Sequence, residues 1–256
     1  MSELFPAKSI AIEVVSCTDQ SKIRLFNRWF DQQHVPALRA TPGIVDVYRY
    51  LDVEPELGDM GVGRFASSPG SPVRYLNLYR IDSDDPFSVM EQVKKDNELR
   101  RDEGSLPEYF ESYETMVWDF VAVRQTVQQP VKAPTLTPDG MPEVVLLVFS
   151  GAGPSKQREH NDWWLYAHSH DLLETPGMTQ CERYRNLDPA AADDDALFMN
   201  IYEFDTDDPA GALLRILEDD EKVRKPQGRF SPFNKPCKQH ASGLYRHWDP
   251  MAGRWS

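Results

Sequence analysis

The order of apolar and polar residues predicts two copies of one structural unit along the chain. Each copy begins with an apolar strand, at residues 10–16 and 144–150, and we align these strands with an offset of 134 residues. A helix with Ser21 as its N-cap follows and reaches about residue 33 in the first copy. Its inward stripe at helical spacing comprises Ile23, Phe26 and Phe30, with Leu25 and Trp29 beside them.

Three more strands and a second helix complete each copy. Thr-Pro-Gly ends the first helical region, and strands follow at 44–51 and 75–81, or 178–184 and 198–204. Asp85-Pro86 and Asp208-Pro209 resemble an N-cap followed by a first-turn proline, so they predict helix starts. The same acidic clusters could bind calcium, but we favour capping. Last strands at 114–124 and 243–248 give the order βαββαβ, a ferredoxin-like split βαβ.

This order leaves one face of each antiparallel sheet without helices, although its strands are apolar on both faces. We therefore predict an α+β protein in which two ferredoxin-like repeats pack sheet to sheet as an intramolecular dimeric α+β barrel. The repeats would span 1–128 and 143–256, with a proline-rich linker at 129–142. The loop 52–73, rich in Gly, Ser and Pro, has no counterpart of similar length in the second repeat and would act as a lid over the first.

The duplication allows each position of the unit to be compared between the two copies. Residues 27–50 and 161–184 are identical at 9 of 24 positions, and both keep a histidine, His34 and His168, at the end of the first helix. A histidine can take or give a proton near neutral pH, so these two are candidate general bases. The alternative is structural, because a histidine near a helix C-terminus also interacts well with unpaired carbonyl groups.

Polar residues on the third strand are retained as well. Asn77 and Tyr79, and their counterparts Asn200 and Tyr202, are two positions apart and share one face of their strand. They could hold a substrate oxygen if that face lines a pocket, or be polar packing if it does not. Tyr50 and Tyr184 have the same ambiguity, while the adjacent Arg49 and Arg183 point the opposite way. The predicted catalytic residues are His34, His168, Tyr79 and Tyr202, and the predicted substrate-binding residues are Asn77, Asn200, Trp29, Trp163, Tyr50, Tyr184 and His170.

Composition narrows the class of partner. A formal charge of −13 and a pI near 4.9 disfavour nucleic acid and anionic membrane surfaces. Three cysteines without metal-type spacing indicate a reduced cytoplasmic protein, and no apolar run approaches the ~20 residues of a membrane span. His168-Ser-His170 does not suit chelation on a helix, because residues two apart do not face each other, so we predict no metal. The expected partner is a small molecule; a homodimer stays open.

The run Phe26-Asn-Arg-Trp-Phe30, followed by a three-residue gap and His34-Val-Pro36, resembles the signature of the EthD-like branch of the dimeric α+β barrel superfamily. The resemblance covers both repeats, about four fifths of the chain. The second repeat departs from it, with His170 in place of Pro36 and Leu165 in place of Asp31. The resemblance implies a broad range: cofactor-independent monooxygenases, isomerases, polyketide cyclases, dehydratases, haem-binding peroxidases and chlorite dismutases, and proteins without a known reaction.

Our first functional hypothesis is a cofactor-independent acid/base enzyme, a lyase, isomerase or cyclase, acting on a small and largely apolar carbonyl or aromatic, polyketide-like substrate. The alternative is a non-catalytic ligand-binding or accessory protein of a catabolic or biosynthetic pathway. The second alternative is a cofactor-independent monooxygenase or a haem-binding barrel. Because the first repeat combines the motif with the long loop 52–73, we expect the better formed cavity there, beside His34.

Overall fold

The computed structural model describes residues 8–52, 74–125, 144–187, 198–206, 208–229 and 242–248, so the predicted linker and most of the loop 52–73 lie outside its described residues. The described chain divides into two compact units. The first comprises residues 8–52, 74–120 and 248, and the second comprises residues 121–125, 144–187, 198–206, 208–229 and 242–247. None of the helices described is both long and apolar enough to span a membrane.

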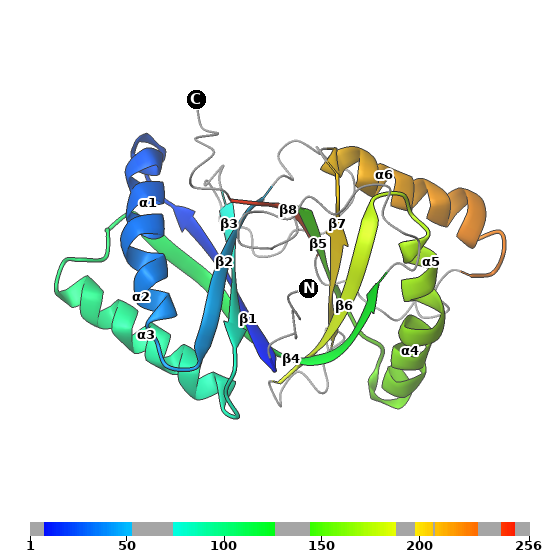
Figure 1. Cartoon of the computed structure of the whole chain (residues 1–256), viewed down its shortest axis with the longest axis horizontal. Helices are drawn as coiled ribbons and strands as arrows, with labels where there is room; N and C mark the ends of the chain where they lie inside the picture. Colours follow the sequence, from blue (N-terminus) through cyan, green and yellow to red (C-terminus); the bar gives the residue numbers. More distant parts are fainter. Residues whose placement is uncertain are drawn as a thin grey trace. The chain divides into compact units, whose positions relative to one another are not determined.

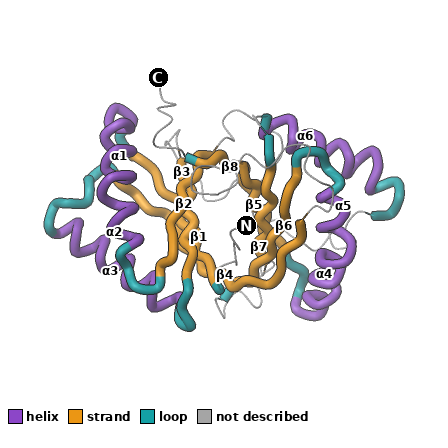
Figure 2. Tube along the Cα trace, in the orientation of Figure 1, coloured by secondary structure: helices purple, strands orange, loops and turns teal. Residues whose placement is uncertain are grey.

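The first unit has the predicted βαββαβ order (Figure 1). Its elements are β1 (Ser9–Cys17), η1 (Gln20–Lys22), α1 (Ile23–Trp29), η2 (Phe30–His34), α2 (Val35–Arg39), β2 (Ile44–Asp52), β3 (Arg74–Ile81), α3 (Pro86–Asp102) and β4 (Phe110–Gln125). The strands are antiparallel in the spatial order β4-β1-β3-β2. The helices all lie on one face of this sheet, so that face forms the core beneath them (Figure 2).

The second unit repeats this arrangement. Its elements are β5 (Val144–Ser150), η4 (Pro154–Lys156), α4 (Gln157–Trp163), η5 (Trp164–His168), α5 (Ser169–Leu173), β6 (Met178–Asn186), β7 (Phe198–Phe204), α6 (Pro209–Asp219), η7 (Asp220–Arg224) and β8 (Ser242–His247). The strand order β8-β5-β7-β6 is the counterpart of β4-β1-β3-β2 and is again antiparallel. The predicted α+β fold class with two ferredoxin-like repeats is confirmed.

The helix boundaries partly differ from the prediction. Asp19, not Ser21, caps the first helical segment, because its carboxylate accepts a hydrogen bond from the Ser21 amide. The segment continues to Arg39, and Leu25 is 53% exposed rather than inward. The predicted caps of the second helices are confirmed: Asp85 accepts from the Ser88 amide, and Asp208 from the Gly211 amide.

A π-helical turn interrupts the first helical segment of both units and ends at the retained histidine. The Val35 amide donates to the Phe30 carbonyl, and the Ser169 amide to the Trp164 carbonyl, which is the wider i→i−5 pattern. This turn places His34 and His168 over the sheet at the same point of each unit. The second unit has another such turn, η7, and its segment from Pro209 to Gly228 is accordingly one residue longer than that from Pro86 to Gly104.

The predicted alignment of the first strands is wrong by one residue. Ala11 pairs with Tyr79 and Leu146 pairs with Tyr202, so β1 and β5 correspond with an offset of 135 residues. The side chains of a strand alternate between its faces, but β5 is apolar on both, so its pattern could not fix the register. The counterpart of Glu13 is therefore Val148.

Candidate functional site

Each unit buries an arginine on the helix-covered face of its sheet. Arg49 and Arg183 are 4% and 0% exposed, and they pair across neighbouring strands with Asn77 and Asn200. Strand-paired residues share a face, so these asparagines also lie beneath the helices, together with Tyr79 and Tyr202 two positions further on. Tyr50 and Tyr184 lie on the opposite face, and the Tyr184 hydroxyl donates to Glu182 at 2.7 Å. The predicted site residues therefore do not all come together.

In the first unit, Arg49 binds a carboxylate and an amide of the helix above it. Its Nη1 donates to Asp31 at 3.0 Å and its Nη2 to Asn27 at 2.7 Å. The guanidinium carbon lies 3.8 Å from the ring centroid of Tyr75 and 4.2 Å from that of Phe30. Burial lowers the pKa of Arg49, and Asp31 opposes that effect, so the guanidinium stays charged.

In the second unit, Arg183 has a different set of partners. Its Nε donates to Asn161 at 2.9 Å and its Nη1 to Asn200 at 2.6 Å, while its Nη2 lies 3.4 Å from Nδ1 of His160. Three substitutions between the repeats accompany this difference: Leu165 occupies the place of Asp31, His160 that of Phe26, and Phe198 that of Tyr75. The arginine and the two asparagines are common to both units.

His34 is packed between aromatic rings and is 1% exposed. Its ring stacks on Trp29 at 4.8 Å and lies 4.7 Å from Phe30. Burial, followed by the charges of Arg100 and Arg49, lowers the pKa of His34 to about 3. The Nη1 of Arg100 lies 3.3 Å from Nδ1, and an arginine can only donate, so Nδ1 carries the lone pair and the proton is on Nε2. His34 is thus a neutral imidazole with a donor at Nε2.

His168 occupies the corresponding place. It stacks on Trp163 at 4.4 Å, and burial together with the charges of Arg224, Arg183 and His160 lowers its pKa to about 3. Arg100 in α3 and Arg224 in η7 correspond to each other once the extra residue of η7 is counted. In both units the charges of two arginines therefore act on the retained histidine and keep it neutral.

Glu13 is a buried carboxylate that the sequence analysis missed. It is 4% exposed and accepts from the Asn77 amide at 3.2 Å, from the Ser112 hydroxyl at 2.5 Å and from the Tyr79 hydroxyl. Burial and the negative charge of Glu13 raise the pKa of Tyr79 well above its usual value, so Tyr79 remains a neutral donor. In the second unit Val148 replaces Glu13, and the Tyr202 hydroxyl accepts from Trp164 at 3.2 Å.

Three buried polar atoms around Arg49 have no hydrogen-bond partner among the described residues: Nε2 of His34, Nε of Arg49 and Oδ1 of Asn77. An unsatisfied buried group costs about 1–3 kcal/mol, so such a concentration needs an explanation. The two acids explain part of it: Nη1 of Arg49 binds Asp31 and the side-chain amide of Asn77 binds Glu13, so Arg49 and Asn77 do not bind each other. In the second unit, Asn200 and the corresponding Arg183 bind each other directly.

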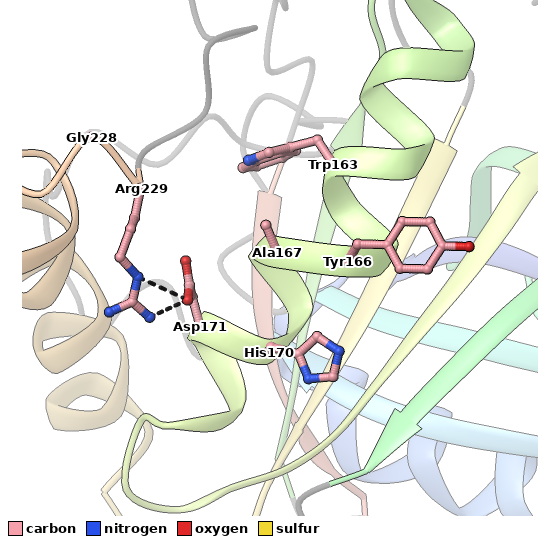
Figure 3. A pocket seen from close by; sticks show the side chains of 7 residues that line it. All are labelled: Trp163, Tyr166, Ala167, His170, Asp171, Gly228 and Arg229. Carbon is pink, nitrogen blue, oxygen red and sulfur yellow. Dashed lines mark hydrogen bonds and ion pairs between the residues drawn. The ribbon is translucent and has the colours of Figure 1, made fainter.

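A pocket of about 510 Å³ lies in the second unit, lined by Trp163, Tyr166, Ala167, His170, Asp171, Gly228 and Arg229 (Figure 3). Two predicted substrate-binding residues, Trp163 and His170, thus line a real pocket. The expected cavity beside His34 stays a prediction, because the lid predicted for the first repeat lies almost wholly outside the described residues.

His34 is 1% exposed and its Nδ1 lies 3.3 Å from Nη1 of Arg100, so this nitrogen does not face an open ligand position. Among the residues described, no group of three or more His, Cys, Asp or Glu side chains is placed to hold a metal.

Part of this site was visible in the sequence. The identities Asn27/Asn161 and Arg49/Arg183 in the repeat alignment pointed to the buried arginine cluster, but a charged residue on a strand was assumed to face away. Asp31 and Glu13 carry no such signal, because the other repeat has apolar residues there. Arg100 was hidden by the one-residue insertion in η7.

Comparisons with known proteins identify the fold, but no family and no specific activity. No protein-family model matches the sequence, and no curated protein matches it. The structure is similar to an anthrone oxidase-like protein (TM-score 0.54, 15% identity, 94% of this chain and 92% of that one). It is also similar to a chlorite dismutase mutant from Candidatus Nitrospira defluvii (TM-score 0.54, 12% identity, 96% of this chain and 94% of that one). A third similar structure is a provisionally assigned monooxygenase from Fusobacterium nucleatum, with a TM-score of 0.52 and 6% identity over 96% of this chain and 94% of that one. The chain therefore has the fold of the dimeric α+β barrel superfamily.

Proposed function

We propose that the chain is a cofactor-independent acid/base enzyme, a lyase, isomerase or cyclase, that acts on a small and largely apolar carbonyl or aromatic substrate. We place the reaction in the first unit. The observation that carries this choice is the set of unpartnered buried polar atoms around Arg49, which the second unit lacks at Arg183 and Asn200. A substrate oxygen would accept from the nitrogen donors of Arg49 and His34, and a substrate hydroxyl would also donate to Oδ1 of Asn77.

Two of these atoms are donors suited to a developing negative charge. Nε–H of Arg49 and Nε2–H of His34 both belong to groups that border the ring of Phe30, at 4.2 and 4.7 Å from its centroid. Preorganised donors in a water-poor site stabilise an enolate or phenolate oxygen strongly. In this proposal His34 polarises the oxygen as a neutral donor, and Nδ1, which a general base would use, stays bound to Arg100.

Glu13 is the base that we propose for the first unit. The hydrogen bonds to its carboxylate come from the neutral groups Asn77, Tyr79 and Ser112, and no cation among the described residues binds it. It would take a proton from the carbon next to the carbonyl, and the electron pair of that C–H bond would move to the oxygen held by Arg49 and His34. Return of the proton to another carbon gives an isomer; loss of a leaving group gives a lyase product.

The comparisons support an enzyme only in general terms. The similar structures include proteins named as an oxidase-like protein, a monooxygenase and a dismutase, and none of these activities is carried over at such low identity. We retain the EthD-like branch as part of this proposal, on the motif that ends at His34 and Pro36.

The test is the variant Glu13→Gln, which keeps the shape and most hydrogen bonds of the side chain. We expect a loss of about 10²- to 10⁴-fold in turnover of a substrate found by screening enolisable ketones and polyketide-like compounds with mass detection. Glu98→Gln, the same change at an exposed position of α3, is the control and should keep full turnover. Unchanged turnover in Glu13→Gln would refute Glu13 as the base.

A second candidate function is a ligand-binding or accessory protein without chemistry of its own. The pocket beside His170 favours it, because that pocket is formed by residues that the first repeat lacks. Mass analysis of the small molecule recovered after incubation decides between the two: a converted compound supports the enzyme, and an unchanged bound compound supports the carrier.

A further inference from the structure

We propose that the pocket of the second unit binds a small aromatic ammonium compound. The site is separate from the reaction proposed for the first unit and does not depend on it. Its volume of about 510 Å³ falls within the ~300–1,000 Å³ typical of small-molecule sites.

One wall of the pocket is aromatic. Trp163, Tyr166 and His170 come from the continuous helical segment α4–η5–α5 at helical spacing, with the small Ala167 between them. Tyr166 is 73% exposed, so a large aromatic surface is available to a ligand. Such rings attract a cation over their faces, with indole the strongest.

Asp171, from the same helical segment, and Arg229, which follows η7, form an ion pair that completes the lining. Both Nε and Nη2 of Arg229 donate to the same oxygen of Asp171, Oδ1 (Figure 3). Its Nη2 also reaches Glu174 at 3.2 Å. These hydrogen bonds raise the pKa of Arg229 further, so the guanidinium is charged but neutralised by two carboxylates. The local sum of one cation and two anions disfavours a carboxylate ligand and favours an ammonium group.

Asp171 keeps an acceptor for that ammonium. The side chain is 11% exposed, and Oδ2 receives no hydrogen bond from the residues that the structure describes. A charge-assisted hydrogen bond to a buried carboxylate is about twice as strong as a neutral one. The net charge of −13 adds a long-range field of the same sign, which attracts cations to the chain.

The first repeat shows whether the fold itself requires these pocket residues. At the corresponding positions it has Gln32, Pro36, Ala37 and Ser105 in place of Tyr166, His170, Asp171 and Arg229. Only Trp29 and Gly104 match the second repeat, as Trp163 and Gly228. The first unit builds the same helices and turn without the aromatic wall or the ion pair, so the fold does not require them.

The experiment compares two probes with the same phenol ring and opposite charge. We expect tyramine to bind the full-length chain and to shift the amide signals of 163–171, with 4-hydroxyphenylacetate at least about tenfold weaker. Asp171→Asn should weaken tyramine binding about tenfold and narrow the preference between the probes, because Arg229 then loses one neutralising charge. Asp162→Asn removes one exposed charge from α4 outside the pocket and should change the affinity less than twofold.

Each other outcome overturns the proposal. No binding of tyramine, or equal binding of both probes, shows that the pocket does not select an ammonium group. Equal weakening by Asp162→Asn and Asp171→Asn shows that only the overall charge of the chain attracts the probe. Tyr166→Gln, which introduces the residue of the first repeat at an exposed position, must also weaken tyramine binding if the aromatic wall takes part.

Discussion

At the scale of single residues, the duplicated chain retains a neutral histidine and a buried arginine, and these two facts are linked. A cation close to an imidazole disfavours its protonated form, and burial acts in the same direction. His34 and His168 thus remain neutral because they lie between their helical segment and the sheet, beside arginines. A histidine that ends a helix and faces solvent would instead titrate near its usual pKa of ~6.5.

The first prediction concerns the protonation of His34. Its ¹⁵N signals should show a neutral ring with the proton on Nε2 at every pH between 5 and 9, because its pKa is about 3 and Arg100 binds Nδ1. The measurement is a long-range ¹H–¹⁵N correlation spectrum across that range. His170, which is exposed in the pocket of the second unit, serves as the comparison signal. A midpoint for His34 between pH 6 and 7 would contradict the packing described.

The second prediction tests the buried ion pair of the first unit. Asp31→Leu introduces the residue of the second repeat but removes the carboxylate that binds Arg49 and the indole of Trp248. Breaking a buried pair on one side leaves an uncompensated charge, so we expect a loss of about 3 kcal/mol in the free energy of unfolding by urea. Asp46→Asn, at the more exposed pair with Arg39, should cost less than about 1 kcal/mol. Equal losses would show that burial of Arg49 does not matter.

At this scale the sequence could reveal only what both repeats share. The retained identities led to His34 and Asn77 and included Arg49, which was not predicted as a site residue. The acids that distinguish the first unit, Glu13 and Asp31, have apolar counterparts in the second, so no identity between the repeats pointed to them. Their importance comes from burial and from hydrogen bonds between residues far apart in sequence, which periodicity cannot show.

At the scale of elements, regular features were predictable and insertions were not. Strand positions, the Asp-Pro helix starts and the βαββαβ order follow from local patterns, and the structure confirms them. The π-helical turns and the one-residue shift of β1 against β5 were missed. A π turn adds a residue without changing the apolar pattern on either side of it, and a doubly buried strand has no polar face to fix its register.

The third prediction concerns the paired strands β6 and β7. Gln180 donates to both Glu182 and Glu203, at 3.0 and 3.1 Å, and burial followed by the charge of Glu182 raises the pKa of Glu203 to about 8. The folded state therefore keeps a proton that the unfolded state releases near pH 4.5. The stability that this proton contributes is complete below pH 4.5 and is lost as the pH rises towards 8.

The variant Glu203→Gln removes this dependence, because an amide does not ionise. We expect its Tm to exceed that of the natural chain by about 2 °C or more at pH 8.5 and to match it at pH 5. Differential scanning calorimetry at the two pH values makes the comparison, with Glu218→Gln on the exposed face of α6 as the control. A variant that is less stable at pH 8.5 would show that the carboxylate of Glu203 is ionised and bound in the folded state.

At the scale of the whole molecule, duplication separated the requirements of the fold from those of the sites. Both units keep the arginine, the asparagines and the stacked histidine between the first helical segment and the sheet, so these residues belong to the shared scaffold. The additions differ: two acids in the core of the first unit, and an aromatic wall with an ion pair in the second. Two diverged copies can thus hold two chemistries on one fold.

The last prediction sums the titrations of four groups, three histidines and Glu203. His34, His160 and His168 all have a pKa lowered from 6.5 to about 3, so each contributes stability that is present above pH 6.5 and is lost as the pH falls towards 3. At pH 5.5 each buried neutral histidine costs about 1.4 kcal/mol, or about 4 kcal/mol for three. Glu203 acts in the opposite direction over the same range and offsets about 2–3 kcal/mol of that loss.

The natural chain should therefore lose only about 1–2 kcal/mol in the free energy of unfolding between pH 7.5 and 5.5, whereas Glu203→Gln should lose about 4 kcal/mol. Urea unfolding of both chains at the two pH values measures this difference directly. Adding His168→Gln to Glu203→Gln should reduce the loss by about one third, since one of three titrating groups is removed. If Glu203→Gln showed no greater acid sensitivity than the natural chain, Glu203 would not keep its proton in the folded state. If the variant lost much less than about 4 kcal/mol, the histidines would not be neutral and buried in the folded state, and the arrangement that both units share would need another explanation.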